Sequence, residues 1–434
     1  MNRTLLRRGL RAAAALGIAA GTLVGLAPQS GAEIAPPGVN HIAAAGSDTT
    51  EVFMEAYLAG KTSASDGVTT WNIATYNIPA LGGTKTVTGD ADCPNGTITY
   101  GPAVNSSTGV GSQYTSTSAT TFPLPNGSSA GRRFLVDQRI TNPDAACVDI
   151  ARSSSAPPFT GETSSFQYYA FALDAVTWGT QSLYAPSTLT AAQIDGIYNC
   201  TFTNWNQVGG LDMPIQRVMA QAGSGTRSFF MQTFGITDAE LNATANGCAP
   251  TIQVGIQEND GRVIPNNVYD NAILPYSAGR WAQQASNRGN PTIDIRDGVR
   301  LGGQTLPGDT ARLLPVEYIS DDSVFQLDTV TNGTRPATVV EQNIALSGFG
   351  FNPATGFLGV RYLFNVIDSN SPSFNVSRAL VGFDNSPSGF KSVLCNTGTS
   401  NVSSFGFARL PATNTPNDSN LALSRCRRFL GTGV

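Results

Sequence analysis

The sequence predicts an α/β fold made of two lobes. Short apolar runs alternate with segments of helical spacing along most of the chain, which is typical of α/β proteins. The chain has 434 residues, of which 41% are hydrophobic and 13% charged, enough for more than one sizeable core. Turns rich in serine, threonine and glycine lie where several of these elements meet. The composition and the alternation together favour globular lobes whose turns can bind a ligand.

The first half of the chain begins with a strand and a helix. "HIAAAG" (41–46) predicts a strand, and a helix follows over 50–58. Residues 82–130 are rich in Gly, Ser, Thr and Pro and predict loops with short strands. "GRRFLVDQRI" (131–140) then predicts a helix, and "CVDIARSSSAP" (147–157) predicts a strand that runs into a loop.

The second half continues the alternation. "QYYAFALDAVTWG" (167–179) and "FLGVRYLFNVID" (357–368) predict buried strands, because both are almost continuously apolar. Residues 189–198 predict a helix and 214–220 a strand, while 271–284 predict a strand followed by a helix. The sequence shows no internal repeat.

Residues 1–32 are predicted to be a signal peptide. A basic segment is followed by an apolar run and by "SGA", which fits cleavage after Ala32. A membrane anchor is the alternative, although the run is short and rich in Ala and Gly. We therefore expect a secreted protein, extracellular or periplasmic.

Charge argues against nucleic acid as a partner. The whole chain carries a net charge of −4, and residues 1–32 hold four arginines and no acid, so the mature chain carries −8. A nucleic acid or an anionic membrane would be repelled by this field. An anionic ligand would need local dipoles and one or two arginines.

The cysteines predict disulfides. Their number is even, the context is exported and no pair has CxxC spacing, so disulfides are favoured over metal ligands. Sequential pairing is expected, because it closes the shorter loops, although six cysteines allow 15 pairings. The expected pairs are Cys93–Cys147, Cys200–Cys248 and Cys395–Cys426. His41 is the one histidine in the sequence, so a His-based metal site or catalytic triad would rest on it, and a structural role is favoured.

Four hydroxyl-rich turns are the candidate functional segments. They are "AGSDTTEVF" (45–53), "NGSSAGRRF" (126–134), "ARSSSAPP" (151–158) and "QAGSGTRSFF" (221–230). Each fits an ordinary helix cap. Helix starts also expose N–H groups that bind anions, and arginine adds charge-assisted hydrogen bonds. "QAGSG" lacks the first glycine of G-x-S-x-G, and no Gly-Lys-Ser/Thr follows, so a nucleophile elbow and a P-loop are not supported.

These segments resemble the phosphate-binding proteins of high-affinity phosphate ABC transporters, which have the type II periplasmic binding protein fold. "LTAAQIDGIYNCTFTNWNQVGG" (189–210), followed by the turn with "GSGTR", is similar to a segment of that family. "NAILPYSAGRW" (271–281) resembles its return strand, and "NGSSAGRRFLVD" with "VDIARSSSAP" resembles its paired serine-rich segments. The resemblance covers 41–60, 126–281 and, more faintly, 357–410. Residues 61–125 and 285–342 look like insertions, the latter of loops and edge strands.

The resemblance implies a set of ligand-binding residues. By motif they are Asp48, Thr49, Ser128, Ser224, Gly225 and Thr226. The chain departs from the family at Ala220, where an arginine is common, so the cation is expected to be Arg227 or Arg152. It has Ser154 or Ser155 in place of an aspartate that accepts the proton of hydrogen phosphate. Asp48 is a hypothetical substitute for that acceptor, and a helix cap is the alternative.

The resemblance implies a two-crossover hinge, with lobe one over 33–172 and 281–434 and lobe two over 173–280. The ligand is expected to be an inorganic oxyanion, with phosphate as the first candidate, and an ABC permease is the candidate partner. No cofactor, metal or chemical step is expected, and the protein is expected to be a monomer. The alternatives are a secreted phosphate-ester hydrolase on the same fold and a surface protein that has lost the ligand.

Overall fold

The computed structural model describes most of residues 165–285 and 358–382 and shorter parts of the rest. Contacts between residues separate 32–434 from 1–31 as two units, and every element below lies in the former. The predicted signal peptide and four of the cysteines (93, 147, 395 and 426) lie outside the described residues. The described residues are 41–59, 63–65, 70–75, 85–88, 97–101, 121–123, 125, 127–138, 148–155, 165–285, 294–305, 312–313, 315–319, 324–327, 358–382, 392, 394, 402, 405–409 and 428–429.

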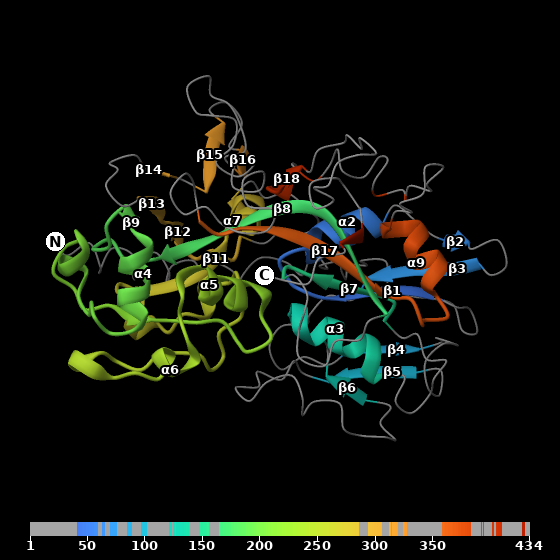
Figure 1. Cartoon of the computed structure of the whole chain (residues 1–434), viewed down its shortest axis with the longest axis horizontal. Helices are drawn as coiled ribbons and strands as arrows, with labels where there is room; N and C mark the ends of the chain where they lie inside the picture. Colours follow the sequence, from blue (N-terminus) through green and yellow to red (C-terminus); the bar gives the residue numbers. More distant parts are fainter. Residues whose placement is uncertain are drawn as a thin grey trace, which may run out of the picture. The chain divides into compact units, whose positions relative to one another are not determined.

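A mixed sheet organises the described part of the chain (Figure 1). Its main path has the order β10-β11-β8-β17-β7-β1-β3-β2, and three further short strands also pair with β8. The strands of the path are β1 (His41–Gly46), β2 (Ser63–Ser65), β3 (Thr70–Thr75), β7 (Ile150–Ser153), β8 (Phe166–Thr180), β10 (Gln216–Arg217), β11 (Ala272–Ser277) and β17 (Val360–Asp368). The further strands are β12 (Arg300–Leu301), β18 (Ala408–Arg409) and β19 (Arg428–Phe429).

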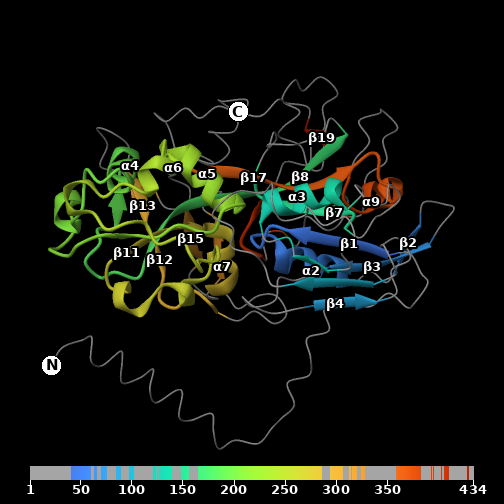
Figure 2. The same ribbon diagram turned by 90° about the horizontal axis from the view of Figure 1, so that it is seen from below.

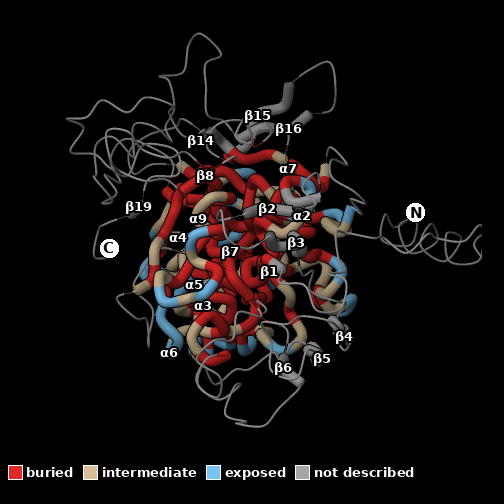
Figure 3. Tube along the Cα trace, turned by 90° about the vertical axis from the view of Figure 1, so that its right-hand side faces the viewer, coloured by how far each residue is buried: buried red, intermediate tan, exposed pale blue. Residues whose placement is uncertain are grey.

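Strand β8 is the longest strand among the described residues and links two parts of the sheet. It pairs antiparallel with β17 along its first ten residues and with β11 along Val176–Gly179. All its residues except Gln167 are buried, as a nearly continuous apolar run predicts. Phe171 belongs to one hydrophobic core and Trp178 to another, so β8 joins two cores. Figure 3 shows the buried stretches of the tube gathered in the centre of the view.

Strands β1, β3 and β7 are parallel and bring their following turns to one edge. β1 pairs with β3 on one side and with β7 on the other. Helix α2 (Glu51–Ala59) packs against β1 and β3, and helix α3 (Ser128–Asp137) packs against β7 and β1. The two helices lie on opposite sides of β1 (Figures 1 and 2). Because parallel strands share a carboxyl edge, the turns that follow β1 and β7 are neighbours.

The remaining described elements are further helices, 3₁₀ turns and the strands of smaller sheets. The other helices are α4 (Ala191–Tyr198), α5 (Gly225–Phe234), α6 (Asp238–Leu241), α7 (Ala278–Ala285) and α9 (Phe374–Val381). Short 3₁₀ turns are η3 (Trp205–Val208), η4 (Ala245–Gly247), η5 (Gly261–Val263) and η6 (Asn266–Val268). Small sheets contain β4 (Lys85–Thr88), β5 (Thr97–Gly101) and β6 (Thr121–Pro123); β9 (Thr188–Leu189), β13 (Gly303–Thr305) and β14 (Arg312–Leu313); and β15 (Val316–Ile319) with β16 (Val324–Leu327).

The predicted α/β class is confirmed, and most strands and helices lie where the sequence places them. The helix expected over 131–140 instead begins at Ser128, where the N–H of Ser129 bonds the carbonyl of Gly223. The strand expected over 214–220 is reduced to β10, because Val218 makes only an isolated bridge to Ile252. The lobe boundaries remain a prediction. Among the described residues, each helix is too short or too polar to cross a bilayer.

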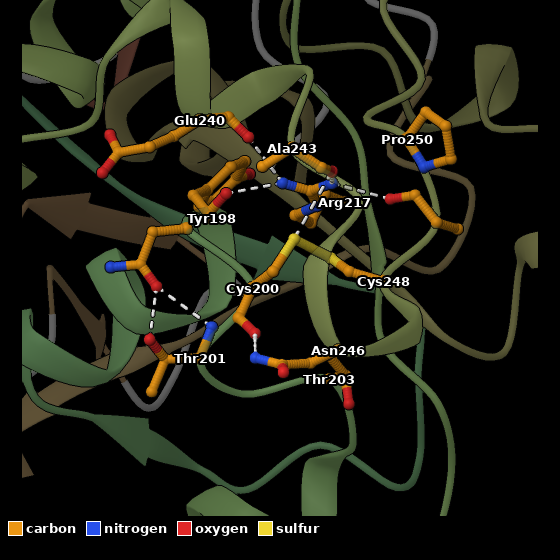
Figure 4. The surroundings of a disulfide bond; sticks show 12 residues. Tyr198, Cys200, Thr201, Thr203, Arg217, Glu240, Ala243, Asn246, Cys248 and Pro250 are labelled. Atoms are coloured by element: carbon orange, nitrogen blue, oxygen red, sulfur yellow. Dashed lines mark hydrogen bonds between the residues drawn. A yellow bond between two sulfur atoms is a disulfide. The ribbon is translucent and has the colours of Figure 1, made fainter.

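A disulfide joins Cys200 and Cys248, as sequential pairing predicts, with their Cα atoms 5.7 Å apart (Figure 4). Beside it lies Arg217, which is 1% exposed. Its guanidinium donates to the carbonyl oxygens of Tyr198, Glu240, Ala243 and Ala249 at 2.5–2.8 Å. Burial lowers the pKa of Arg217. The arginine and the disulfide together fix the segments around α6.

Candidate functional site

The turns after β1 and β7 meet directly. The N–H of Ser47 donates to the carbonyl of Arg152 at 3.0 Å, and the Ser47 hydroxyl donates to Ser154 Oγ at 3.0 Å. Gly46 has φ +124°, and a Cβ there would lie 2.5 Å from the carbonyl oxygen of Arg152. Only glycine fits this approach without a shift of the backbone. The β1 and β7 turns are therefore held together by both backbone and side chains.

The start of α3 adds Ser128 to this pair of turns. Ser128 Oγ accepts from the N–H of Ser154 at 2.8 Å and lies 3.1 Å from Ser154 Oγ. Both side chains are fully buried. Two of the sequence-predicted ligand serines thus lie side by side.

The turn at the start of α5 completes the group. Gly225 packs against Ser128 and Ser154 so closely that a Cβ would lie 2.3 and 2.4 Å from their hydroxyl oxygens. Next to it, Thr226 Oγ1 lies 3.4 Å from Thr49 Oγ1, although the residues are 177 positions apart. We call Ser47, Thr49, Ser128, Ser154 and Thr226 the hydroxyl cluster; each is at most 1% exposed.

An arginine that the sequence did not single out supplies the positive charge. Arg361 lies on β17 and donates through Nη2 to Thr226 Oγ1 at 3.0 Å and to Thr49 Oγ1 at 3.2 Å. Its other contacts go to Asp174 on β8, at 2.7 Å from Nη2 and 3.0 Å from Nε. Nη1 is buried and has no hydrogen-bond partner among the described residues. One clue was present: a single arginine inside the apolar run 357–368 indicates a buried, paired charge.

A buried carboxylate, that of Glu258, contacts the turn at the start of α5. Glu258 accepts from the Ser224 hydroxyl and, at 3.2 Å, from the N–H of Thr226. Burial alone would raise its pKa, but hydrogen bonds from Asp48, Ser224 and Thr226 and the charge of Arg361 lower the pKa below its ordinary value of 4.5. Glu258 is therefore ionised. Its segment "QENDG" has the composition of an exposed loop, so the local sequence does not indicate a buried carboxylate.

Asp48 has the opposite electrostatic character. Burial, followed by the charge of Glu258, raises its pKa well above the ordinary value of 3.8. The side-chain amides of Gln257 and Asn259 also face it, at 3.4 and 3.5 Å. The hypothesis that Asp48 is the acceptor carboxylate requires the ionised form, whereas this environment favours a protonated carboxyl that donates to Glu258. The ionised member of the pair is Glu258.

The structure does not bring the side chains of Arg152, Ser155 and Arg227 into the hydroxyl cluster. Arg152 Nε donates to the carbonyl of Ser47 at 3.1 Å and so stabilises the turn that follows β1. Ser155 Oγ accepts from Arg132 at 2.9 Å. The guanidinium of Arg227 instead contacts other groups of its own region, namely the carbonyl of Ala220, Gln253 and Asp238.

The hydroxyl cluster presents donor groups of the kinds that can bind an anion. Hydroxyl groups from three helix starts and the β7 turn converge with one buried guanidinium. Hydroxyls can turn their protons toward an anion, and buried N–H and guanidinium donors form charge-assisted hydrogen bonds.

Comparisons with known proteins identify the family. The model of the PBP superfamily domain matches residues 94–334, which is more than half of the chain. No curated protein sequence matches. Solved structures that share a likeness include a Clostridium perfringens protein assigned as a phosphate ABC transporter substrate-binding protein, with phosphate bound (16% identity, 86% of this chain and 100% of that chain, TM-score 0.43). Another is an ABC-type phosphate transport receptor from Vibrio cholerae (16% identity, 86% and 100%, TM-score 0.42). By the family match, the chain belongs to the PBP superfamily, in agreement with the resemblance noted in its motifs.

Proposed function

We propose that this protein is a solute-binding protein that holds phosphate at the hydroxyl cluster. The observation that carries the proposal is the position of Arg361. Its guanidinium donates to Thr49 and Thr226, which come from turns far apart in the sequence. Within the described part of the chain its Nη1 is a buried donor without a partner, and such a donor is costly unless a ligand oxygen accepts from it.

The donors are sufficient for useful affinity. A hydrogen bond to a charged group contributes about 1.5–3 kcal/mol. Five or six such bonds, from the cluster hydroxyls, the start of α5 and Arg361, can offset the desolvation of the anion. The remainder can reach micromolar binding, about −8 kcal/mol.

In this proposal Arg361 is the cation, in place of Arg227 or Arg152. Asp174 neutralises Arg361, so the site relies on aimed hydrogen bonds more than on net charge. This suits a chain whose overall charge is negative. The proposed site therefore combines an anion site at a helix N-terminus with one guanidinium group.

The wider setting is also a proposal. Residues 1–32 direct export, lobes 33–172 with 281–434 and 173–280 close on the ligand by a hinge, and the protein works as a monomer that delivers phosphate to an ABC permease. The contact between Thr49 and Thr226 supports closure, because the predicted lobe boundary separates these residues. A ligand held by both turns stabilises the closed state.

Calorimetry with phosphate tests the proposal. Thr226→Val removes one cluster hydroxyl while keeping the side-chain shape, and it should weaken binding about 10- to 150-fold, which corresponds to one charge-assisted hydrogen bond. Arg227→Gln is the matched control, because its guanidinium lies among other partners, and it should change the affinity less than about twofold. If Arg227→Gln abolished phosphate binding and Thr226→Val left the affinity unchanged, the assignment of the site to the hydroxyl cluster would be contradicted.

A further inference from the structure

The start of α5 already holds an anionic oxygen. Glu258 accepts from the Ser224 hydroxyl and from the N–H of Thr226, and its side chain is almost completely buried at 1% exposure. These donors belong to the same turn that the motif resemblance assigns to the oxyanion. A carboxylate oxygen takes from this helix start the same hydrogen bonds that a phosphate oxygen would take.

The charges around Glu258 do not favour a second anion beside it. Arg361 is ion-paired with Asp174, so its charge is already balanced. Asp48 is the other titratable group in hydrogen-bonding contact with Glu258, and Glu51 and Arg280 act on Asp48 from further away. A phosphate that entered with Glu258 in place would meet a fixed negative charge on its own donors.

We propose that Glu258 is an internal competitor for the anion and thereby sets the affinity of the site. Phosphate reaches the start of α5 when it displaces the Glu258 carboxylate from Ser224 and Thr226. This inference rests on the proposed function, because it concerns the same turn and the same ligand.

The backbone next to Glu258 is anchored, so only the Glu258 side chain needs to move when phosphate replaces it. Asn259 has φ +58°, in the left-handed region. Its carbonyl accepts from the Tyr276 hydroxyl at 2.6 Å, and its Oδ1 accepts from the N–H of Ser277 at 2.8 Å. The segment is therefore anchored to β11 one residue after Glu258. Rotation of the Glu258 side chain can release the helix start while this anchor stays in place.

Titration of phosphate into the wild type, Glu258→Gln and Glu258→Ala by calorimetry tests the proposal. Glu258→Gln keeps the shape and removes the charge, and Glu258→Ala removes the competing group. Both should bind phosphate at least about tenfold more tightly than the wild type, which is about 1.4 kcal/mol. Asp212→Asn is the control for net charge, since it removes one exposed carboxylate and should leave the affinity within about twofold.

The outcomes separate the two proposals. If the wild type binds phosphate and both Glu258 variants bind equally or more weakly, the competitor role is wrong and the phosphate site stands. If Glu258→Gln leaves phosphate affinity unchanged but admits sulfate, the carboxylate selects the ligand by accepting its proton, and the competitor role is again wrong. If the wild type and both variants bind neither phosphate nor sulfate at millimolar concentration, the proposed function fails together with this inference. Should Glu258→Gln not fold, Glu258→Ala carries the comparison.

Discussion

Arg361 and Asp174 face each other as a directly paired position of β17 and β8, and their side chains form an ion pair with Nη2 2.7 Å from Oδ2. Both residues are at most 3% exposed. Asp174 also accepts from the hydroxyl of Ser277 and from the N–H of Gly279. The register of two antiparallel strands thus fixes the guanidinium that contacts the hydroxyl cluster.

This buried pair gives the first prediction. Arg361→Gln alone should lower the free energy of unfolding by about 3–5 kcal/mol, because it leaves Asp174 charged and buried. The double variant Arg361→Gln/Asp174→Asn should recover most of that loss and still fail to bind phosphate. Urea unfolding measures the first effect and calorimetry the second. Equal stability of the single and double variants would show that the two side chains are not energetically coupled.

The close packing of Gly225 gives the second prediction. Gly225→Ala places a Cβ against Ser128 and Ser154, so the turns must move apart. We expect a loss of about 1–3 kcal/mol in the free energy of unfolding, together with weaker phosphate binding. Ser228→Ala is the matched control, an alanine at an exposed position of the same helix, and it should have little effect on binding. A Gly225→Ala protein that binds like the wild type would mean that the turns need not touch.

The proton held near Asp48 gives the third prediction. The folded pKa of Asp48 is raised above 3.8, so its contribution to stability is fully present at lower pH and declines as the pH rises through the raised value. The slope approaches about 1.4 kcal/mol per pH unit for one proton. Glu258 has the opposite sign, because its lowered pKa stabilises the fold above pH 4.5 and the effect is lost on acidification.

Urea unfolding of the wild type and of Asp48→Asn between pH 5 and pH 8 measures this effect. The range lies above the ordinary pKa of an aspartate, where a raised pKa makes the stability of the wild type depend on pH. The amide can still donate to Glu258 but does not titrate. The variant should therefore gain stability relative to the wild type as the pH rises. Parallel curves for the two proteins would show that Asp48 does not hold a proton in the folded state.

The disulfide gives the fourth prediction. Cys200 and Cys248 enclose a segment with a sequence separation of 48, and loop entropy predicts a stabilisation of about 4 kcal/mol. Guanidinium unfolding of the wild type and of Cys200→Ser/Cys248→Ser should show a loss of this order. Because Arg217 bonds carbonyls on both sides of α6, Arg217→Lys should further lower the stability of the double cysteine variant. An unchanged unfolding midpoint in the double cysteine variant would contradict the predicted role of the bridge.

The sequence predicts the main strands and the hydroxyl-rich turns of the site. It does not predict the charged residues of the site. Hydrophobic runs place β1, β8 and β17, and the hydroxyl-rich turns indicate Ser128 and Thr226. Hydrophobic periodicity and turn composition can be recognised within one short segment, so they need no knowledge of the tertiary structure.

The charged residues of the site depend on contacts between segments that are distant in the sequence. Arg361 reaches the cluster only through the register of β17 with β8, and no local pattern contains that register. Glu258 is buried by the turns that surround it, although its own segment is polar. Arg227 was chosen for its place next to the turn, but a side chain three positions after a helix cap points along the helix surface to Gln253 and Asp238.

A crystal structure of the protein with phosphate tests the central claim most directly. We predict a phosphate ion that accepts hydrogen bonds from the hydroxyls of Thr49 and Thr226 and from the guanidinium of Arg361. A phosphate ion held at Arg227 and away from these three residues, or an unoccupied hydroxyl cluster at saturating phosphate, would contradict the account.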